Sequence, residues 1–569
     1  MLNENLIKIF QESFRENREL PAISDYFKNE KYSYYEFAKE VAKMHLLFKK
    51  AKIAPGDKIA MVGRNNPKWC ICYIATITYG AVIVPILQDF SPTDIIHIVN
   101  HSESRLLFLS DIFWDDIEES QIKQIEAVFS LTDFSLIYER GGTALTRFQG
   151  SIVKHYRSKY PQGFSKNDIK YPDLPNDHVC LLNYTSGTTG HSKGVIITIN
   201  NLTGNIVTAL NFVNPETGDK YFPKGGRALS FLPLAHAYGC SFDFLTQLAA
   251  GGHITLLGRI PSPKILLEAM LTVKPTTICC VPLILEKVYR KQIMPLLEKG
   301  PMSIAMKIPL LNTAIYSAIK KKLLDGFGGE VKLFVVGGAS INRETEDFLM
   351  KIGFPITVGY GMTECAPLIS FSEHTYFKPG SCGKALTDML TVKIDSEDPQ
   401  NIPGEIMVKG EHVMVGYYKN ERDTNAVLSK DGWLSTGDIG IMDEDGIIFI
   451  KGRSKTMILS GSGQNIYPEL IEGKLNNLYL VNESLVVEHG NRLIALVVPD
   501  YETMSLDGVS RDGLQEIMNN NIKELNATLA AYERVSSVII YPDEFEKTPK
   551  KSIKRYLYNT AKLTKLMDA

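Results

Sequence analysis

Short apolar segments alternate with helical segments along residues 33–361, and this alternation restricts the fold more than any other feature of the sequence. Residues 33–51 (SYYEFAKEVAKMHLLFKKA) have the apolar spacing of an amphipathic helix, whereas residues 58–63 (KIAMVG) and 105–110 (RLLFLS) are typical of short buried strands. Similar apolar runs recur at 178–184, 228–234, 253–258, 276–282, 332–338 and 355–361. The pattern predicts an α/β fold with largely parallel sheets.

The pattern changes after about residue 380. Short strands with tight turns follow, as in IGIMDEDGIIFIKGR at 439–453, where Asp445-Gly446 is a strong hairpin signal. This predicts a small β subdomain within a large N-terminal body of residues 1–454. The remaining segments run strand, helix, strand, strand, helix, which predicts a small α+β C-terminal domain of residues 455–569.

Composition and charge exclude several classes of protein. The 569 residues carry 62 Lys+Arg against 64 Asp+Glu, a formal charge of −2, which argues against a dedicated nucleic-acid binder. The eight cysteines form no CxxC pair and no cysteine–histidine ligand spacing, so we expect reduced thiols in a cytoplasmic protein. The N-terminus lacks the basic start and apolar core of a signal peptide.

One uncharged stretch, residues 69–88, nearly has the length of a membrane span. Gly80 interrupts it, and Asn66-Pro67 before it forms a good helix cap and first helical position. We therefore expect a helix over 67–79 and a buried strand over 82–86.

The segment with the clearest chemistry is LLNYTSGTTGHSKGV at 181–195. A buried strand runs into a loop rich in glycine and hydroxyl side chains, and Lys193 follows. Glycines let backbone N–H groups turn toward an anion, hydroxyls add donors, and the lysine supplies a positive charge. The segment predicts a polyphosphate-binding loop rather than an ordinary surface turn. The lysine is misplaced for the pattern GxxxxGK[ST], so this is not that nucleotide-binding loop.

This loop resembles the phosphate loop of the adenylate-forming superfamily, which includes acyl-CoA synthetases, luciferases and the adenylation domains of peptide synthetases. Further segments match in the family's order: FLPLAHAYG at 231–239, VVGGAS at 335–340, VGYGMTEC at 358–365, PGSCGKAL at 379–386, PGEIMVKG at 403–410, DGWLSTGD at 431–438, IKGRSKTMI at 450–458 and SGSGQNIYPELIE at 460–472. Within the superfamily, NNPKW at 65–69 and VPLILEKVY at 281–289 resemble long-chain fatty acyl-CoA synthetases.

The resemblance implies an enzyme that uses ATP and Mg²⁺ to convert a fatty acid into an acyl-adenylate, with release of pyrophosphate. A thiol, normally that of coenzyme A, then displaces AMP. The alternatives are an acyl-acyl-carrier-protein synthetase, a fatty acyl-AMP ligase, or a non-catalytic relative that binds nucleotide or acyl chains. The expected partners are small molecules, and a fatty-acid substrate is compatible with transient membrane contact.

The resemblance also assigns roles to individual residues. The groups expected at the β- and γ-phosphates are Thr185, Ser186, Gly187, Thr188, Thr189, Gly190 and Lys193. Thr363 is expected at the α-phosphate and Glu364 at magnesium, since this hard cation prefers a carboxylate with phosphate oxygens. The adenine pocket is expected to be lined by Gly338, Ala339 and Ser340 on one side and by Gly359, Tyr360 and Gly361 on the other.

Seven further residues are expected around the ribose, the acyl group, the pantetheine arm of the thiol acceptor and the hinge. Asp438 should accept hydrogen bonds from the ribose hydroxyls, and Arg453 should reach ribose or phosphate. His236 is expected near the acyl carboxylate, although a purely structural histidine is an alternative. The residues expected to meet the pantetheine arm are Gly463, Gln464 and Asn465. Lys455 occupies the family's hinge, about which the small domain rotates between half-reactions.

The sequence departs from the family near its C-terminus. The family usually ends with T-x-x-G-K-I-x-R, whose lysine bridges the carboxylate and the α-phosphate, but here the segment that begins at Thr548 reads TPKKSIKR and has Ser552 at the lysine position. A serine cannot replace an ammonium group electrostatically. Three interpretations remain open: Lys551 reaches the site through a shifted loop, Lys550 or another lysine substitutes, or adenylation is slow. We take Lys551 as the working hypothesis. A second departure is Ile199, where many relatives have histidine.

Overall fold

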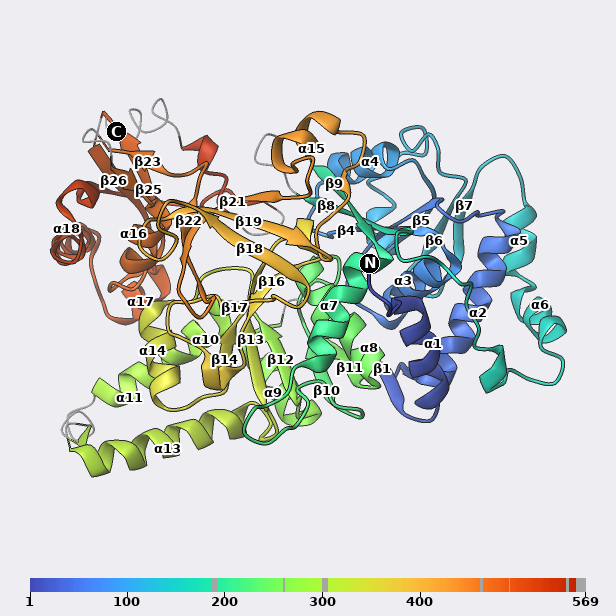
Figure 1. Cartoon of the computed structure of the whole chain (residues 1–569), viewed down its shortest axis with the longest axis horizontal. Helices are drawn as coiled ribbons and strands as arrows, with labels where there is room; N and C mark the ends of the chain where they lie inside the picture. The colour runs from blue at the N-terminus through green and yellow to red at the C-terminus, as the bar shows by residue number, and fades with distance from the viewer. Residues whose placement is uncertain are drawn as a thin grey trace.

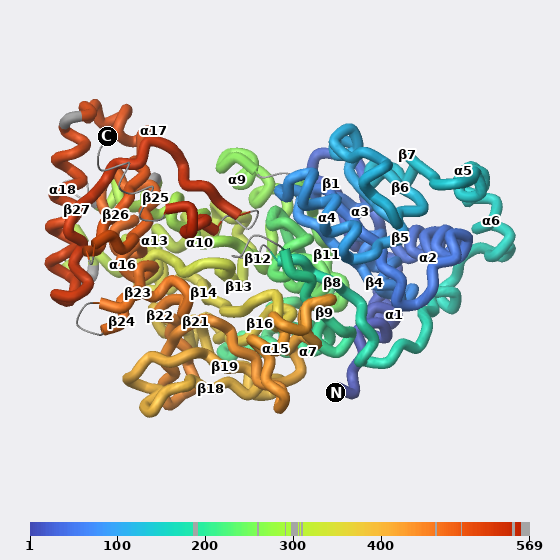
Figure 2. Tube along the Cα trace, turned by 90° about the horizontal axis from the view of Figure 1, so that it is seen from above, coloured from blue at the N-terminus to red at the C-terminus, as the bar shows by residue number. Residues whose placement is uncertain are grey.

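The molecule is elongated, with the red C-terminal region at one end of its long axis and helices α5 (Ala144–Gln149) and α6 (Ile152–Lys159) at the other (Figures 1 and 2). The computed structural model describes residues 1–185, 192–258, 261–298, 305–306, 308–460, 464–490, 492–548 and 552–558. The elements before residue 160 lie in one half of the molecule, the last β-sheet lies at the end of the other half, and the antiparallel strands of residues 390–453 lie between them. The fold is mixed α/β, as the sequence predicts.

The largest sheet has eight strands, and its parallel centre confirms the predicted α/β alternation. Their order is β20 (Gly416–Tyr417), β9 (Lys193–Thr198), β8 (Val179–Thr185), β4 (Val82–Ile86), β3 (Lys58–Val62), β5 (Ser104–Leu109), β6 (Ala127–Ser130) and β7 (Leu136–Glu139). Strands β8, β4, β3, β5 and β6 are parallel neighbours, whereas β7, β9 and β20 pair antiparallel.

Three smaller sheets complete the α/β part of the body. The first contains β10 (Arg227–Ser230), β11 (His253–Leu256), β1 (Pro21–Asp25) and β2 (Lys31–Ser33). The second is parallel and contains β12 (Thr277–Cys280), β13 (Leu333–Val336) and β14 (Ile356–Val358). The third contains β15 (Tyr360–Gly361), β16 (Leu368–Phe371) and β17 (Lys384–Ala385). Only the first part of the apolar run at 228–234 is strand, since β10 ends at Ser230. Pro233 follows three residues later and has no N–H with which to continue the strand pairing.

Antiparallel strands form the predicted β subdomain. They are β18 (Leu390–Asp395), β19 (Gly404–Gly410), β21 (Leu434–Met442) and β22 (Ile448–Arg453). The turn between β21 and β22 contains Asp445-Gly446, and Gly446 has the left-handed φ of +79° that its place in a tight turn requires.

The C-terminal region folds around a three-stranded sheet of β25 (Val481–His489), β26 (Arg492–Pro499) and β27 (Val535–Ile540), with a short hairpin of β23 (Ile458–Leu459) and β24 (Asn465–Ile466) before it. The sequence analysis missed β27, which pairs parallel to β26. Its sequence, VSSVII, has two exposed serines and lacks the apolar run that identified the other strands.

Helices cover the sheets and connect their strands. In the body they are α1 (Leu6–Glu16), α2 (Tyr34–Lys50), α3 (Pro67–Tyr79), α4 (Pro92–His101), α5 (Ala144–Gln149), α6 (Ile152–Lys159), α7 (Ile199–Asn211), α8 (Thr246–Ala250), α9 (Pro263–Val273), α10 (Pro282–Val288), α11 (Met294–Glu298), α13 (Pro309–Gly326), α14 (Arg343–Lys351) and α15 (Glu421–Val427). The C-terminal region adds α16 (Pro468–Leu475), α17 (Tyr501–Leu506) and α18 (Arg511–Ala527).

The uncharged stretch that raised a membrane question forms the predicted helix and strand. Helix α3 starts at Pro67, Asn66 accepts a hydrogen bond from the Trp69 N–H as its N-cap, and Gly80 ends it with φ +93°. Strand β4 follows and is buried along its whole length. In the described part of the chain, no helix is both long and apolar enough to span a membrane.

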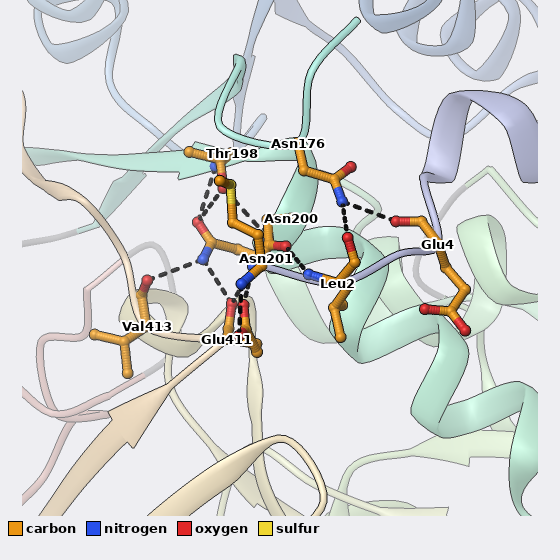
Figure 3. Close-up of polar contacts among 9 residues, drawn as sticks. Leu2, Glu4, Asn176, Thr198, Asn200, Asn201, Glu411 and Val413 are labelled. Atoms are coloured by element: carbon orange, nitrogen blue, oxygen red, sulfur yellow. Dashed lines mark hydrogen bonds and ion pairs between the residues drawn. The ribbon is translucent and has the colours of Figure 1, made fainter.

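An amide network at the start of α7 ties three distant segments together (Figure 3). Asn201 accepts a hydrogen bond from the Thr198 N–H and donates its own amide hydrogens to the backbone oxygens of Glu411 and Val413, at 2.8 and 2.9 Å. Asn200 accepts a hydrogen bond from the Leu2 N–H and donates to Glu411. The network therefore fixes residues 411–413 against the helix that follows the predicted phosphate loop.

Candidate functional site

A cavity of about 2200 Å³ lies between the N-terminal body and the C-terminal region, and residues of both line it. Of the residues that the sequence assigns to the site, those lining the cavity are Thr185, Lys193, His236, Gly338, Ala339, Ser340, Gly359, Tyr360, Gly361, Thr363, Glu364, Asp438 and Arg453. The fold thus brings together motifs that are separated by up to 268 residues in the sequence, from Thr185 to Arg453.

Two glycine-containing segments, residues 338–340 and 359–361, line the cavity. Gly338, just after β13, has φ +85°, a conformation that favours glycine. At Gly361 a Cβ would lie 2.1 Å from the Pro367 carbonyl oxygen, so only glycine fits this close approach. At Gly338 and Gly361 the main chain therefore borders the cavity with no side chain in between. This leaves room for a flat ligand against the main chain.

Asp438 is a buried carboxylate of the cavity lining. Its Oδ2 accepts a hydrogen bond from the Tyr360 hydroxyl at 2.8 Å, and its Oδ1 lies 3.2 Å from the Arg453 Nε. Cross-strand pairing of β21 with β22 puts Asp438 opposite Arg453. Burial raises the pKa of Asp438, and the Arg453 guanidinium partly offsets this. Burial, together with the neighbouring Asp438 charge, also raises the pKa of Tyr360, so the phenol stays a donor.

Glu364 and Lys193 also line the cavity, and both contact Tyr417. The Glu364 Oε1 accepts a hydrogen bond from the Tyr417 hydroxyl at 2.8 Å, and the Lys193 Nζ lies 4.9 Å from the centre of the Tyr417 ring. Lys193 also pairs with Asp423 at 2.6 Å, and this contact lowers the pKa of the Asp423 carboxyl to about 2. The acidic Glu364 and the basic Lys193 thus line the same cavity.

Thr185 and Lys193 are cross-strand partners in β8 and β9, so both ends of the predicted phosphate loop open onto the cavity. The loop residues between them that the sequence analysis named, Ser186, Gly187, Thr188, Thr189 and Gly190, lie outside the described residues, as do Gly463 and Lys551. These assignments stay predictions.

The expected acyl-side and acceptor-side residues differ in their placement. His236 lines the cavity, and its Nδ1 accepts a hydrogen bond from the Tyr238 N–H at 3.3 Å. Gln464 and Asn465 belong to the β23–β24 hairpin and are not among the described residues that line the cavity. The structure therefore does not bring them together with the other predicted groups.

The C-terminal segment that departs from the family reaches the same cavity. The Thr548 N–H donates to the Ser552 carbonyl oxygen at 2.8 Å, and both residues line the cavity. Arg555, three residues on, forms an ion pair with buried Glu472. The positions that flank Lys550 and Lys551 therefore open onto the space that contains Glu364 and Lys193.

Two supporting residues were missed by the sequence analysis. Asn205 on α7 is fully buried, donates to the Cys365 carbonyl oxygen and accepts from the Leu368 N–H, so it holds the backbone on both sides of cis Ala366-Pro367. Tyr417 bridges Glu364 and Lys193 from β20. Neither lies in a motif that marks chemistry, and their partners are 53 to 224 residues away.

The residues present fit a magnesium ion that is shared with a nucleotide. Glu364 would supply one carboxylate, whose Oε1 accepts the hydrogen bond from the Tyr417 hydroxyl. Among the described residues no group of three or more His, Cys, Asp or Glu side chains could hold a metal alone. One or two carboxylates completed by phosphate oxygens is the arrangement that Mg²⁺ commonly adopts.

Comparison with known proteins gives consistent matches over nearly the whole chain. Residues 10–418 match the family described as AMP-binding enzyme, and residues 455–561 match the AMP-binding enzyme C-terminal domain. The chain is 28% identical to long chain acyl-CoA synthetase 6, peroxisomal, of Arabidopsis thaliana, over 82% of this chain and 69% of the relative. It is 26% identical to long-chain-fatty-acid–CoA ligase 1 of Homo sapiens, over 94% of this chain and 81% of the relative.

The fold is similar to solved structures as well. ATP-bound MatB from Rhodopseudomonas palustris aligns with a TM-score of 0.74 at 22% identity, over 98% of this chain and 99% of that one. At this level of identity the match concerns the fold alone.

Proposed function

Because the chain belongs to the AMP-binding enzyme family, we propose that it activates a fatty acid with ATP and transfers the acyl group to coenzyme A. In the first step a carboxylate oxygen attacks the α-phosphorus of ATP, and the bond from that phosphorus to pyrophosphate breaks. In the second step a thiol attacks the acyl carbon of the acyl-adenylate, AMP leaves, and the thiol proton passes to solvent. A free carboxylate needs this activation because its own leaving group would be an oxide.

The observation that carries this proposal is the composition of the cavity. Lys193, Glu364 and Asp438 lie on elements far apart in the sequence, yet all three line one space with Gly338 and Gly361. A site that takes a polyphosphate, a ribose and a flat base needs a cation, a metal-binding carboxylate, a ribose acceptor and close backbone approach. The bound Mg²⁺ would neutralise phosphate charge, while the protein's groups position the reactants.

Apolar side chains support a fatty acid as the carboxylate substrate. The cavity lining includes Phe212, Phe222, Phe242 and Phe371, and the rings of Phe212 and Phe371 stack with 4.2 Å between their centres. Such a surface favours a carboxylate substrate whose remaining part is an apolar acyl chain over one whose remaining part is polar or charged. Burying apolar area is favourable by about 25 cal/mol per Å². The apolar lining and the names of the relatives together lead us to propose a medium- to long-chain fatty acid as the substrate.

We also propose that residues 1–454 and 455–569 are separate domains and that the second moves about Lys455. The C-terminal family match starts at residue 455, and buried apolar side chains beyond it form two clusters of their own. Lys455 itself lines the cavity. A rotation would also account for the position of Gln464 and Asn465 outside the cavity, since the family brings this loop to the site in the second step.

The eight cysteines are all free thiols, which agrees with the cytoplasmic location that we propose. The Arabidopsis relative is named as peroxisomal, so fractionation of the native cell is the direct test.

The function is tested by a panel of carboxylic acids, each incubated with ATP and Mg²⁺ and assayed for AMP. We expect AMP formation to depend on a fatty acid of medium to long chain and to turn over when coenzyme A is present. Turnover with an acyl carrier protein in place of coenzyme A would instead identify the carrier-protein ligase. No acid-dependent AMP or pyrophosphate would refute the activation step.

A further inference from the structure

Tyr417 contacts two charged residues of the cavity lining, Glu364 and Lys193. Its hydroxyl donates to the Glu364 Oε1 at 2.8 Å, and its ring faces the Lys193 Nζ at 4.9 Å from the ring centre. The side chain itself lines the cavity and is only 9% exposed. One rigid aromatic group thus connects the predicted metal ligand with the predicted phosphate-binding lysine.

The backbone around Tyr417 is fixed from three directions. Tyr417 pairs with Val195 across β20 and β9, two residues from Lys193. Its own N–H donates to the Thr424 hydroxyl at 2.9 Å. Upstream, the Met414 N–H donates to the Glu364 carbonyl oxygen at 2.8 Å. The same short segment therefore holds the main chain beside both charged groups, and its tyrosine holds their side chains.

The two contacts of Tyr417 act on different groups. The hydroxyl orients the Glu364 carboxylate by one oxygen, and no described residue forms a hydrogen bond with the other oxygen. The ring gives Lys193 a favourable surface for its positive charge, and this contact needs no hydroxyl. Partners of a metal ligand that orient it in this way commonly contribute 10- to 100-fold to metal affinity.

We propose that Tyr417 is a positioning residue that couples divalent-cation binding at Glu364 to nucleoside-triphosphate binding at Lys193. This inference rests on the proposed function, because it takes a magnesium nucleotide as the ligand of the cavity. The hydroxyl supports the cation, and the ring supports the lysine that meets the phosphates.

The chain offers a matched control in the next residue. The Tyr418 hydroxyl also donates to a glutamate, the Glu103 Oε2, at 2.8 Å, and Tyr418 is not among the described residues that line the cavity. Tyr418→Phe therefore removes the same kind of hydrogen bond one position away. Tyr417→Phe removes the hydroxyl and keeps the ring, whereas Tyr417→Leu removes both.

The experiment measures binding of α,β-methylene-ATP by calorimetry, once with saturating Mg²⁺ and once with EDTA, for the wild-type chain and the three variants. The ratio of the two affinities gives the coupling between cation and nucleotide without any acyl chemistry. Thermal midpoints of all four proteins report on folding separately.

In Tyr417→Phe we expect the coupling ratio to fall about tenfold while the affinity in EDTA stays that of the wild type. In Tyr417→Leu we expect the affinity in EDTA to fall as well, by about threefold or more, because the lysine loses the ring. Tyr418→Phe should match the wild type in both conditions. If Tyr417→Leu does not fold, Tyr417→Phe against Tyr418→Phe decides the question.

An unchanged coupling ratio in Tyr417→Phe would overturn the proposal, and so would an equal loss in Tyr418→Phe. Nucleotide affinity of the wild type that is indifferent to Mg²⁺ would overturn it too. A chain that shows the expected coupling but forms no AMP with any carboxylic acid would refute the proposed function and leave the role of Tyr417 standing.

Discussion

At the scale of single residues, Asp438 combines burial with two polar partners in a way that suits a ligand-binding carboxylate. Tyr360 donates to one of its oxygens, and the Arg453 Nε lies 3.2 Å from the other. The Arg453 side chain is itself 65% exposed, so the pair opens toward the cavity rather than closing a core. A carboxylate that is kept oriented but not enclosed can accept further hydrogen bonds from a ligand.

Asp438→Asn should therefore weaken nucleotide binding specifically. Hydrogen bonds to a charged group contribute about 1.5–3 kcal/mol each, so we expect the KM for ATP to rise about 10- to 100-fold while the KM for the fatty acid stays unchanged. Steady-state kinetics with each substrate varied in turn measure this. Asp443→Asn is the control, since Asp443 pairs with Lys378 in the turn between β21 and β22. An equal effect at Asp443, or none at Asp438, would refute the assignment.

At the scale of elements, helix α7 holds two segments of the candidate site in place through hydrogen bonds. Its first turn holds residues 411–413 through Asn200 and Asn201 (Figure 3). Its middle holds residues 365–368 through Asn205. The held segments lead directly to Tyr417 and to Glu364. Strand β9, which carries Lys193, directly precedes the helix, so α7 joins Lys193 to the segments next to Tyr417 and Glu364.

Asn201→Asp tests this role of α7. The substitution keeps the side-chain oxygen that caps the helix, but it removes both donated hydrogen bonds and puts a negative charge against two carbonyl oxygens. We expect the free energy of unfolding to fall by about 2 kcal/mol, because buried acceptors lose their partners, and the KM for ATP to rise. Urea unfolding and kinetics give the two readouts. Asn211→Asp, at the exposed end of the same helix, should change neither; equal losses in the two variants would contradict the role.

The sequence predicts elements whose ends and faces are set locally. Helix α3 could be placed to the residue because Asn66, Pro67 and Gly80 define its ends without help from the rest of the chain. Strand β27 and the contacts of Asn205 depend on partners far away in the sequence, so no local pattern reveals them. The site motifs could be assigned because each is a short segment, whereas the Tyr360–Asp438 contact joins two of them only in the folded chain.

At the scale of the whole molecule, the cavity exists because two regions of the chain meet. Thr548, Ser552 and Arg555 of the C-terminal region line it together with Glu364 and Lys193 of the body. If the proposed adenylation takes place in this cavity, we expect it to need both regions, with a lysine next to Ser552 as the source of the missing positive charge.

Lysine variants locate that charge. We expect Lys551→Ala to slow acid-dependent pyrophosphate release about 100-fold, a loss typical of removing one group that stabilises transition-state charge, and to leave acyl transfer from added acyl-adenylate to coenzyme A nearly unchanged. Lys547→Ala is the control, because Lys547 pairs with Glu483 at 3.0 Å and is not among the described residues that line the cavity. Wild-type pyrophosphate release in Lys551→Ala would reject the hypothesis, and a loss in Lys550→Ala instead would move the role to that residue.

The central claim is that this molecule joins a carboxylate oxygen to the α-phosphorus of ATP. It is tested most directly by supplying a fatty acid labelled with ¹⁸O in both carboxylate oxygens and analysing the products by mass spectrometry. The account predicts AMP that carries one ¹⁸O, unlabelled pyrophosphate and an acyl-CoA that retains the other ¹⁸O. Unlabelled AMP, or ADP with labelled phosphate, would contradict it.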